Sequence, residues 1–198
     1  MRRPASATEN RTNDKLFPAT IGRPILSIRN ATGGDAAAIA AIYNHYVLQT
    51  PISFEEQAVA DDDMAQRVAG VQEKGLPWIV WETNGVIVGY AYATPWRVRH
   101  AYRFSVETSV YLMHGKAGQG MGAHLYRTLL ARLAEGGYRL AIGGIALPNE
   151  ASIALHEKMG YQKAAHFKGV GFKFDRWIDV GYWQIALGEA GAASPPAA

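Results

Sequence analysis

Three glycines at alternate positions, Gly118, Gly120 and Gly122, separate a stretch with strand character from a stretch with helix character. A backbone without Cβ atoms can approach a bound ligand closely. The first amides of the following helix have no partner within the helix, and together with the helix dipole they favour an anion. The arrangement suits a pyrophosphate. A tight glycine turn without any ligand is the alternative interpretation of the same residues.

The glycine turn also resembles two other phosphate-binding patterns. A loose dinucleotide pattern, G-x-G-x-x-A, runs from Gly118 to Ala123, but it requires a preceding β-α-β unit and an acidic residue about 20 residues later. The residues before the turn instead resemble an antiparallel meander, and residues 140–147 contain no acid. The nucleoside-triphosphate loop needs Gly-Lys-Ser/Thr, whereas Lys116 is followed by Ala117. An acyl-coenzyme A pyrophosphate fits the pattern that remains.

One carboxylate and one imidazole near this turn could exchange protons with a substrate. Glu107 is flanked at alternate positions by Ser105 and Ser109, so these side chains share one face of the preceding strand. A carboxylate there could act as a base, or it could simply face solvent. His156 lies near the middle of a helix that Asn149 opens, where it could carry a proton or pack beside the sheet.

Two arginines offer a means of holding an anionic substrate. Arg97 and Arg99 follow Trp96 in a segment without strand or helix periodicity. An arginine in a loop is most often only solvated, yet its guanidinium group matches carboxylate and phosphinate oxygens with paired hydrogen bonds. The nearby rings of Tyr92, Trp96 and Tyr102 favour a pocket for a doubly anionic amino acid.

The composition excludes several other classes of site and partner. The chain has 198 residues, of which 48% are hydrophobic and 19% charged, as in an ordinary globular domain. The absence of cysteine rules out disulfides, cysteine-ligated metals and a cysteine nucleophile, and it is compatible with a reducing cytosol. The other histidines lack metal-ligand spacing, so no metal is expected. A net charge of +3 favours a small anionic ligand but not nucleic acid, and no apolar run approaches the ~20 residues of a membrane helix.

The candidate residues need a framework in which strands and helices alternate. In chain order, hydrophobic periodicity predicts a strand at 25–29, a helix after a capping box at 32–35, a helix at 62–74, strands at 78–82, 86–93 and 104–112, a helix ending at 135, a strand at 140–147, a helix at 149–159, and strands at 161–168 and 178–187. Asn84-Gly85 predicts a tight hairpin. The order is that of a mixed α/β sandwich with antiparallel strands at the front. We expect one domain over 25–187, a mobile leader over 1–24 and a tail of the same kind over 188–198.

A series of short segments along the chain matches a single enzyme family. The segments are Tyr43–Tyr46, Ser53-Phe54, Tyr90–Ala93, Pro95–Arg99, Glu107–Tyr111, Leu147–Asn149, Leu155–Glu157, Gly160-Tyr161, Gly171–Lys173 and Trp177–Gln184. In them the sequence resembles the GNAT superfamily of N-acetyltransferases, in particular its branch of phosphinothricin and methionine sulfoximine acetyltransferases. The superfamily loop Q/R-x-x-G-x-G/A corresponds here to Ala117–Gly122, with alanine in place of the usual Gln or Arg and with Lys116 adjacent.

The resemblance implies the GNAT fold, with a mostly antiparallel sheet and an acyl-CoA cleft between the fourth and fifth strands. It also implies acetyl-CoA as co-substrate, a small glutamate-like amino acid as acceptor, a homodimer and a cytoplasmic location. Residues implied at the coenzyme are Val110, Tyr111, Leu112, Ala117, Gly118, Gln119, Gly120, Met121, Gly122, Ala123 and Asn149, the last of which would also cap its helix. Those expected at the amino acid are Phe54, Tyr92, Arg97, Arg99 and Tyr102.

The resemblance also assigns chemical roles. Glu107 becomes the general base that deprotonates the amine, and His156 becomes either the acid that protonates the departing thiolate or a second base. Two other functions remain open: a coenzyme A-binding sensor without catalysis, and an acetyltransferase for another amine or a protein N-terminus. The presence of Glu107 and His156 argues against the sensor. The sequence shows no long acidic or open basic groove of the kind that a protein-modifying or nucleic-acid-associated enzyme would need.

Overall fold

The computed structural model describes residues 26–188 as one α/β unit. Its elements are β1 (Leu26–Asn30), η1 (Gly33–Asp35), α1 (Ala36–Gln49), α2 (Asp61–Gln72), β2 (Trp78–Thr83), β3 (Val86–Pro95), η2 (His100–Tyr102), β4 (Ser105–Leu112), α3 (Met121–Glu135), β5 (Leu140–Leu147), α4 (Glu150–Lys158), β6 (Gln162–Lys173) and β7 (Arg176–Ala186). Except for Gly188, the expected leader and tail lie outside the described residues.

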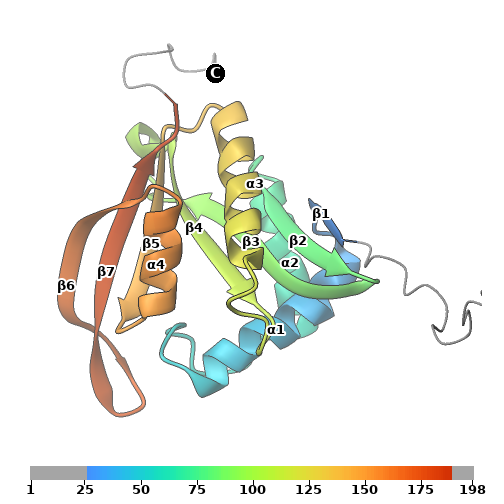
Figure 1. Ribbon diagram of the computed structural model, residues 1–198, viewed down its shortest axis with the longest axis horizontal. Coiled ribbons are helices and arrows are strands. Elements are labelled where there is room, and N and C mark those ends of the chain that lie inside the picture. The colour runs from blue at the N-terminus through green and yellow to red at the C-terminus, as the bar shows by residue number, and fades with distance from the viewer. Residues whose placement is uncertain (1–25, 189–198) are drawn as a thin grey trace, which may run out of the picture.

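The strands form a seven-stranded sheet in the order β1-β2-β3-β4-β5-β7-β6. Neighbouring strands are antiparallel except β4 and β5, which run parallel because α3 crosses from the end of one to the start of the other. The expected mixed, mostly antiparallel fold is confirmed. Figure 1 shows that β6 and β7 form a long hairpin that curves away from β1, β2 and β3.

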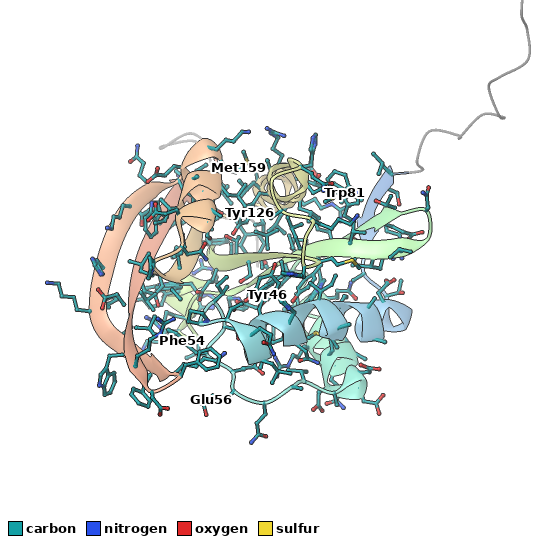
Figure 2. The ribbon with its side chains drawn as sticks, turned by 60° about the horizontal axis from the view of Figure 1, so that its bottom comes forward. Tyr46, Phe54, Glu56, Trp81, Tyr126 and Met159 are labelled. Carbon is teal, nitrogen blue, oxygen red and sulfur yellow. The ribbon has the colours of Figure 1, made fainter. Side chains whose placement is uncertain are left out.

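Helices cover both faces of this sheet, with α1 and α2 on one face and α3 and α4 on the other (Figures 1 and 2). Alternate residues of β4 point to the two layers. On the α1 face, the ring centroid of Tyr111 lies 5.3 Å from that of Tyr43 and 5.1 Å from that of Tyr46. On the α3 face, Val106 and Thr108 are buried.

Two local signals in the sequence fold as their residue types require. Asp35 accepts hydrogen bonds from the backbone nitrogen and hydroxyl of Thr32, which completes the capping box before α1. The Arg29 guanidinium also donates to this carboxylate, which lowers the pKa of Asp35 to about 2. At the β2–β3 turn, Asn84 and Gly85 have φ angles of 50° and 81°, as a two-residue hairpin of the predicted kind needs.

Most predicted bounds agree with the structure to within two residues, but the predicted end of β6 was wrong. The expected strand at 161–168 continues to Lys173 as β6, and β7 starts at Arg176 rather than at 178. The ladder slips between Phe167 and Gly171, so a bulge interrupts the alternation on which the prediction relied. The turn places Phe174 and Asp175 at positive φ, and this pair of residue types did not predict a turn there.

Candidate active site

The parallel strands β4 and β5 separate after only three residue pairs. These pairs are Ser105 with Leu140, Val106 with Ala141 and Glu107 with Ile142. Beyond them, β4 continues beside β3 and β5 continues beside β7, with no ladder between the two. The sheet is therefore open along this line, starting at Glu107, between the fourth and fifth strands where the sequence led us to expect a cleft.

Residues from both strands and from α4 line the opening. They are Ile52, Thr108, Ser109, Val110, Tyr111, Tyr126, Gly144, Ile145, Ala146, Asn149, Ser152 and His156. Four residues singled out in the sequence are among them: Val110, Tyr111, Asn149 and His156. The expected contact residue Leu112 is not, and its carbonyl accepts a hydrogen bond of 2.7 Å from the Tyr46 hydroxyl.

The glycine turn leads directly from β4 into α3. Gly118 and Gly120 adopt φ angles of 81° and 78°, a left-handed conformation that favours glycine. Gly120 is the N-cap of α3, and no side chain caps the helix there. Residues 117–120 are exposed, whereas Met121, Gly122 and Ala123 are buried in the first turn of α3. The first amides of α3 therefore have no side-chain partner at the N-cap, and the pyrophosphate site expected there stays a prediction.

The carboxylate of Glu107 lies on the α1 face at the point where the strands separate. A Cβ atom on Gly144 would lie 3.0 Å from Glu107 Oε1 and 3.2 Å from the Tyr182 ring, so the carboxylate rests over the backbone of β5. Burial raises the pKa of Glu107, and the positive charge of Arg97 partly opposes this rise. A carboxyl group with a raised pKa on the edge of a cleft is suited to accept a proton near neutral pH.

The imidazole of His156 lies on the opposite face and is only 3% exposed. Nδ1 lies 2.8 Å from the carbonyl oxygen of Ser152, and Nε2 lies 2.8 Å from the hydroxyl of Tyr126. Burial lowers the pKa of His156, although the contact with the Ser152 carbonyl opposes this. The lowered pKa favours the imidazole over the imidazolium in the resting protein.

Two adjacent glycines of β5 make room for both of these groups. A side chain on Gly143 would overlap the imidazole of His156, whereas one on Gly144 would press on Glu107 and Tyr182. Consecutive residues of a strand point to opposite faces, so the pair accommodates one reactive group on each side of the sheet. Glu107 and His156 thus lie at the same level of the cleft but on different faces.

Asn149 holds the start of α4 at the edge of the cleft. Its side-chain oxygen accepts a hydrogen bond of 3.1 Å from the backbone nitrogen of Ser152. It is thus the helix cap that the sequence predicts. This bond also fixes the first turn of α4, which carries the Ser152 carbonyl toward His156.

The sequence pattern of the family described as "Acetyltransferase (GNAT) domain" matches residues 28–181. The chain belongs to the GNAT family of acetyltransferases. It is therefore an acyltransferase, with the fold and the cleft between β4 and β5 described above.

Relatives of this GNAT acetyltransferase include phosphinothricin and methionine sulfoximine/sulfone acetyltransferases. A phosphinothricin N-acetyltransferase of Alcaligenes faecalis is 40% identical over 97% of this chain and 99% of its own length. An L-methionine sulfoximine/L-methionine sulfone acetyltransferase of Salmonella typhimurium is 37% identical over 84% of this chain and 98% of its own. A phosphinothricin acetyltransferase of Sinorhizobium meliloti, solved in complex with acetyl-CoA, has a TM-score of 0.82 and 36% identity, covering 86% and 92% of the two chains.

The residues expected at the amino acid are spread over this acetyltransferase rather than gathered in one pocket. Arg97 is exposed, with its guanidinium carbon 4.5 Å above the centre of the Trp96 ring, and it acts electrostatically on Glu107. Arg99 and Tyr102 are also exposed, at the two ends of η2. Tyr92 is half-buried: it stacks on Trp78, with ring centroids 4.2 Å apart, and it is close enough to Glu107 to be affected by its charge.

The remaining expected residue, Phe54, belongs to a latch between the α1–α2 loop and the β6–β7 hairpin. Its ring covers Gly171, where a side chain would collide with it, and Figure 2 shows Phe54 beside the hairpin. Lys173, only 3% exposed, donates 2.6 Å hydrogen bonds to the carbonyls of Val47 and Ser53. The latch fixes the part of the loop that also contributes Ile52 to the cleft.

Several residues of the site were missed in the sequence. Tyr126, Thr108 and Ser152 lie in the cleft because of contacts between elements, and no local pattern marks them. Gly143-Gly144 did carry a signal, since two glycines inside a strand often mark a close approach of another group. Within residues 26–188, no cluster of three or more potential ligands could hold a metal ion, and no helix is long and apolar enough to cross a membrane.

Proposed function

We propose that this enzyme transfers an acetyl group from acetyl-CoA to the α-amine of a small glutamate-like amino acid, of the phosphinothricin, methionine sulfoximine or methionine sulfone type. The observation that carries the proposal is the opening of the sheet at Glu107, which leads to the uncapped start of α3. The named activities of relatives that match at 37–40% identity support the choice of acceptor.

The proposed coenzyme site consists of the cleft and the glycine turn. The pyrophosphate binds at residues 117–123, where exposed backbone amides and the dipole of α3 favour an anion. The pantetheine arm passes between β4 and β5, past Val110, Tyr111 and Asn149. Within residues 26–188 the β4–β5 pairing ends at Glu107, so the amides of β4 toward Leu112 on that side would be available to polarise the thioester carbonyl.

The proposed chemistry is a direct transfer without an acyl-enzyme. Glu107 takes a proton from the substrate ammonium, directly or through a water, and the free amine attacks the thioester carbon. After the attack the nitrogen loses its second proton, the carbon–sulfur bond breaks, and the thiolate gains a proton. His156, on the opposite face of the sheet, accepts the proton of the nitrogen as a neutral imidazole and returns it to the sulfur as an imidazolium, while the proton held by Glu107 passes to solvent.

The proposed acceptor site lies on the α1 face, around Glu107. Arg97 is near enough to influence this carboxylate, and together with Arg99 it would bind the acidic ends of the amino acid. Phe54, Tyr92 and Tyr102 complete the expected set. Of these, Phe54 would act through the latch described above rather than as an isolated contact.

A homodimer and a cytoplasmic location complete the proposal. The β6–β7 hairpin supports the dimer, because Phe172 and Trp177 form an exposed aromatic pair with ring centroids 5.1 Å apart. Exposed aromatic side chains of this kind are common at interfaces between proteins. Light scattering at micromolar protein tests the dimer, and a monomeric mass would contradict it. Fractionation of cells tests the location.

Release of free thiol from acetyl-CoA tests the proposed activity. The assay uses a panel that includes phosphinothricin, methionine sulfone, glutamate, other amino acids and short peptides. We expect release with the glutamate-like amino acids and an acetylated α-amine in the product. Binding of coenzyme A without release for any amine would instead indicate the catalytically silent sensor. Release with peptides alone would indicate a protein N-terminus as the acceptor.

A further inference from the structure

Both ring nitrogens of the buried His156 contact oxygen atoms of the protein. Nδ1 lies 2.8 Å from the backbone carbonyl of Ser152 and 3.4 Å from the hydroxyl of the same residue. Nε2 lies 2.8 Å from the hydroxyl of Tyr126 on α3. Figure 2 shows Tyr126 in the layer between α3 and α4, on the side of the sheet away from Tyr46.

These contacts define which atom donates. A carbonyl oxygen can only accept, so Nδ1 carries the hydrogen that faces Ser152. In the neutral ring, Nε2 is then the acceptor and the hydroxyl of Tyr126 donates to it. The neutral histidine is therefore held as a single tautomer.

The same hydroxyl can also serve the charged ring. When Nε2 gains a proton, it becomes a donor, and the oxygen of Tyr126 can accept from it. The hydroxyl proton of Tyr126 can then turn to the carbonyl oxygen of Thr108, 3.4 Å away. Nε2 therefore has a hydrogen-bond partner in both protonation states. A buried polar atom without a partner would cost free energy.

Tyr161, the other tyrosine that packs against the imidazole, does not bond to it. The Tyr161 ring centroid lies 5.0 Å away, but its hydroxyl is 2.8 Å from Oγ1 of Thr108. That Oγ1 donates in turn to the carbonyl of Ile142, so the Tyr161 hydroxyl donates to Thr108. On the β5 side, the backbone of Gly143 lies against the ring. Burial, rather than a neighbouring charge, dominates the environment of His156.

We propose that Tyr126 is a positioning residue that lets His156 change its protonation state during turnover, with its hydroxyl donating to Nε2 in one state and accepting from it in the other. The proposal rests on the proposed acetyl transfer, in which the thiolate must gain a proton. It adds to that reaction a residue of α3, which acts through His156. The position of Tyr126 along α3 follows from the start of this helix at the glycine turn.

The variant Tyr126→Phe removes only the hydroxyl, and Tyr161→Phe is its matched control. Both tyrosines are buried and pack edge-on against His156, but only the Tyr126 hydroxyl bonds to the imidazole. We expect Tyr126→Phe to lower the pKa of His156, because the hydrogen bond that the charged ring loses is stronger than the one that the neutral ring loses. We expect Tyr161→Phe to leave the pKa of His156 as in the wild type. Turnover should fall roughly 2- to 10-fold in Tyr126→Phe, the effect of one hydrogen bond, with little change in either Michaelis constant.

Nuclear magnetic resonance of protein with isotope-labelled histidine measures this titration without any need for activity, and the His156→Gln spectrum assigns the signal. An unchanged His156 titration in Tyr126→Phe, or equal shifts in both variants, would overturn the proposal. A neutral wild-type ring with its hydrogen on Nε2 would overturn it too, even if Tyr126→Phe did not fold. Absence of thiol release by the wild type, with the predicted difference in titration, would instead overturn the proposed function and leave this hydrogen-bond network standing.

Discussion

At the scale of single residues, the site depends on two glycines of β5, because a side chain at either position would take the space of a reactive group. Gly143 and Gly144 leave space for a rigid, buried imidazole on one face and for a carboxylate on the other. The two spaces differ in how they can respond to a new methyl group. His156 is fixed by hydrogen bonds at both ring nitrogens, and a Cβ on Gly143 would overlap it, whereas a Cβ on Gly144 would meet the end of the flexible Glu107 side chain at 3.0 Å and the Tyr182 ring at 3.2 Å.

Alanine at each of these two glycines should therefore have a different effect. Gly143→Ala should destabilise the fold by about 1–3 kcal/mol, the usual cost of overpacking, because the imidazole cannot move aside. Gly144→Ala should keep most of its stability but lose turnover, because it displaces the carboxylate of Glu107. Thermal unfolding and thiol release, measured on both variants, test this. Equal losses of stability in Gly143→Ala and Gly144→Ala would contradict the expected difference between the two positions.

Variants of the two loop arginines should distinguish binding of the acceptor from the effect of a nearby charge on the protonation of Glu107. Arg97→Ala and Arg99→Ala should each raise the Michaelis constant for a glutamate-like acceptor by about 10- to 150-fold, the effect of losing a charge-assisted pair. The Michaelis constant for acetyl-CoA should hardly change. Only Arg97→Ala should also move the acidic limb of the pH–rate profile to higher pH, because Arg97 lowers the pKa of Glu107. A similar loss for both substrates would point to a role in folding or in coenzyme binding.

Residue identity predicted part of the site and left another part out. Glu107, His156 and the glycine turn could be singled out because their residue types and spacing are themselves chemical signals. Tyr126 could not, since a tyrosine on the buried side of an amphipathic helix looks like any core residue. Its contact with His156 depends on how α3 and α4 pack on the sheet, and no local pattern encodes that arrangement.

At the scale of secondary-structure elements, the position of the α1–α2 loop depends on the tip of the β6–β7 hairpin. Lys173 reaches from the end of β6 to two backbone carbonyls, one in the last turn of α1 and one in the loop. The Tyr43 hydroxyl lies 2.8 Å from Oγ of Ser53 and so holds the same loop from inside. Burial lowers the pKa of Lys173, and the negative charges of Glu56 and Glu55 partly oppose this.

Removal of this ammonium should weaken the latch. Lys173→Met leaves the carbonyls of Val47 and Ser53 without their donor, which should cost about 1–3 kcal/mol of the free energy of unfolding. For a domain of this size that corresponds to a fall of about 2–4 °C in melting temperature per kcal/mol. Lys168→Met, an exposed lysine on the same strand, should have little effect. Equal melting temperatures for the two variants would show that the latch contributes nothing to stability.

Most elements could be predicted because their hydrophobic periodicity is regular. The strand at 140–147 was predicted at its observed bounds, and Asn84-Gly85 marked its turn correctly. The end of β6 could not be predicted, since the bulge before Gly171 breaks the period of two. The parallel pairing of β4 and β5 for only three residue pairs, which opens the cleft, is a matter of tertiary structure.

At the scale of the whole molecule, the sheet is held together everywhere except where the co-substrate is proposed to bind. Antiparallel ladders join β1 to β4 on one side and β5, β7 and β6 on the other. The two halves meet through the short β4–β5 ladder and through the helices that cover it. A ligand that fills the opening should therefore stabilise the folded state as a whole.

Acetyl-CoA should accordingly raise the melting temperature. At 100 times its dissociation constant, a ligand that binds only the folded state contributes about 2.7 kcal/mol. Differential scanning fluorimetry measures the shift, and NADH serves as a control that also carries a pyrophosphate. Equal shifts with NADH would mean that the glycine turn binds any pyrophosphate, and no shift with acetyl-CoA would contradict the coenzyme site.

The central claim, that Glu107 is the base of an amino-acid acetyl transfer, is tested most directly by the pH–rate profile of Glu107→Gln beside the wild type, with saturating acetyl-CoA and methionine sulfone. The substitution keeps the shape of the side chain and removes its basicity, so turnover should fall about 10²–10⁴-fold with little change in acetyl-CoA affinity. Because burial raises the pKa of Glu107, the wild type should lose activity as the pH falls through that raised value, and the variant should lack this limb. Near-normal turnover of Glu107→Gln at neutral pH, together with loss of activity in His156→Phe, would contradict the claim and assign the base to His156.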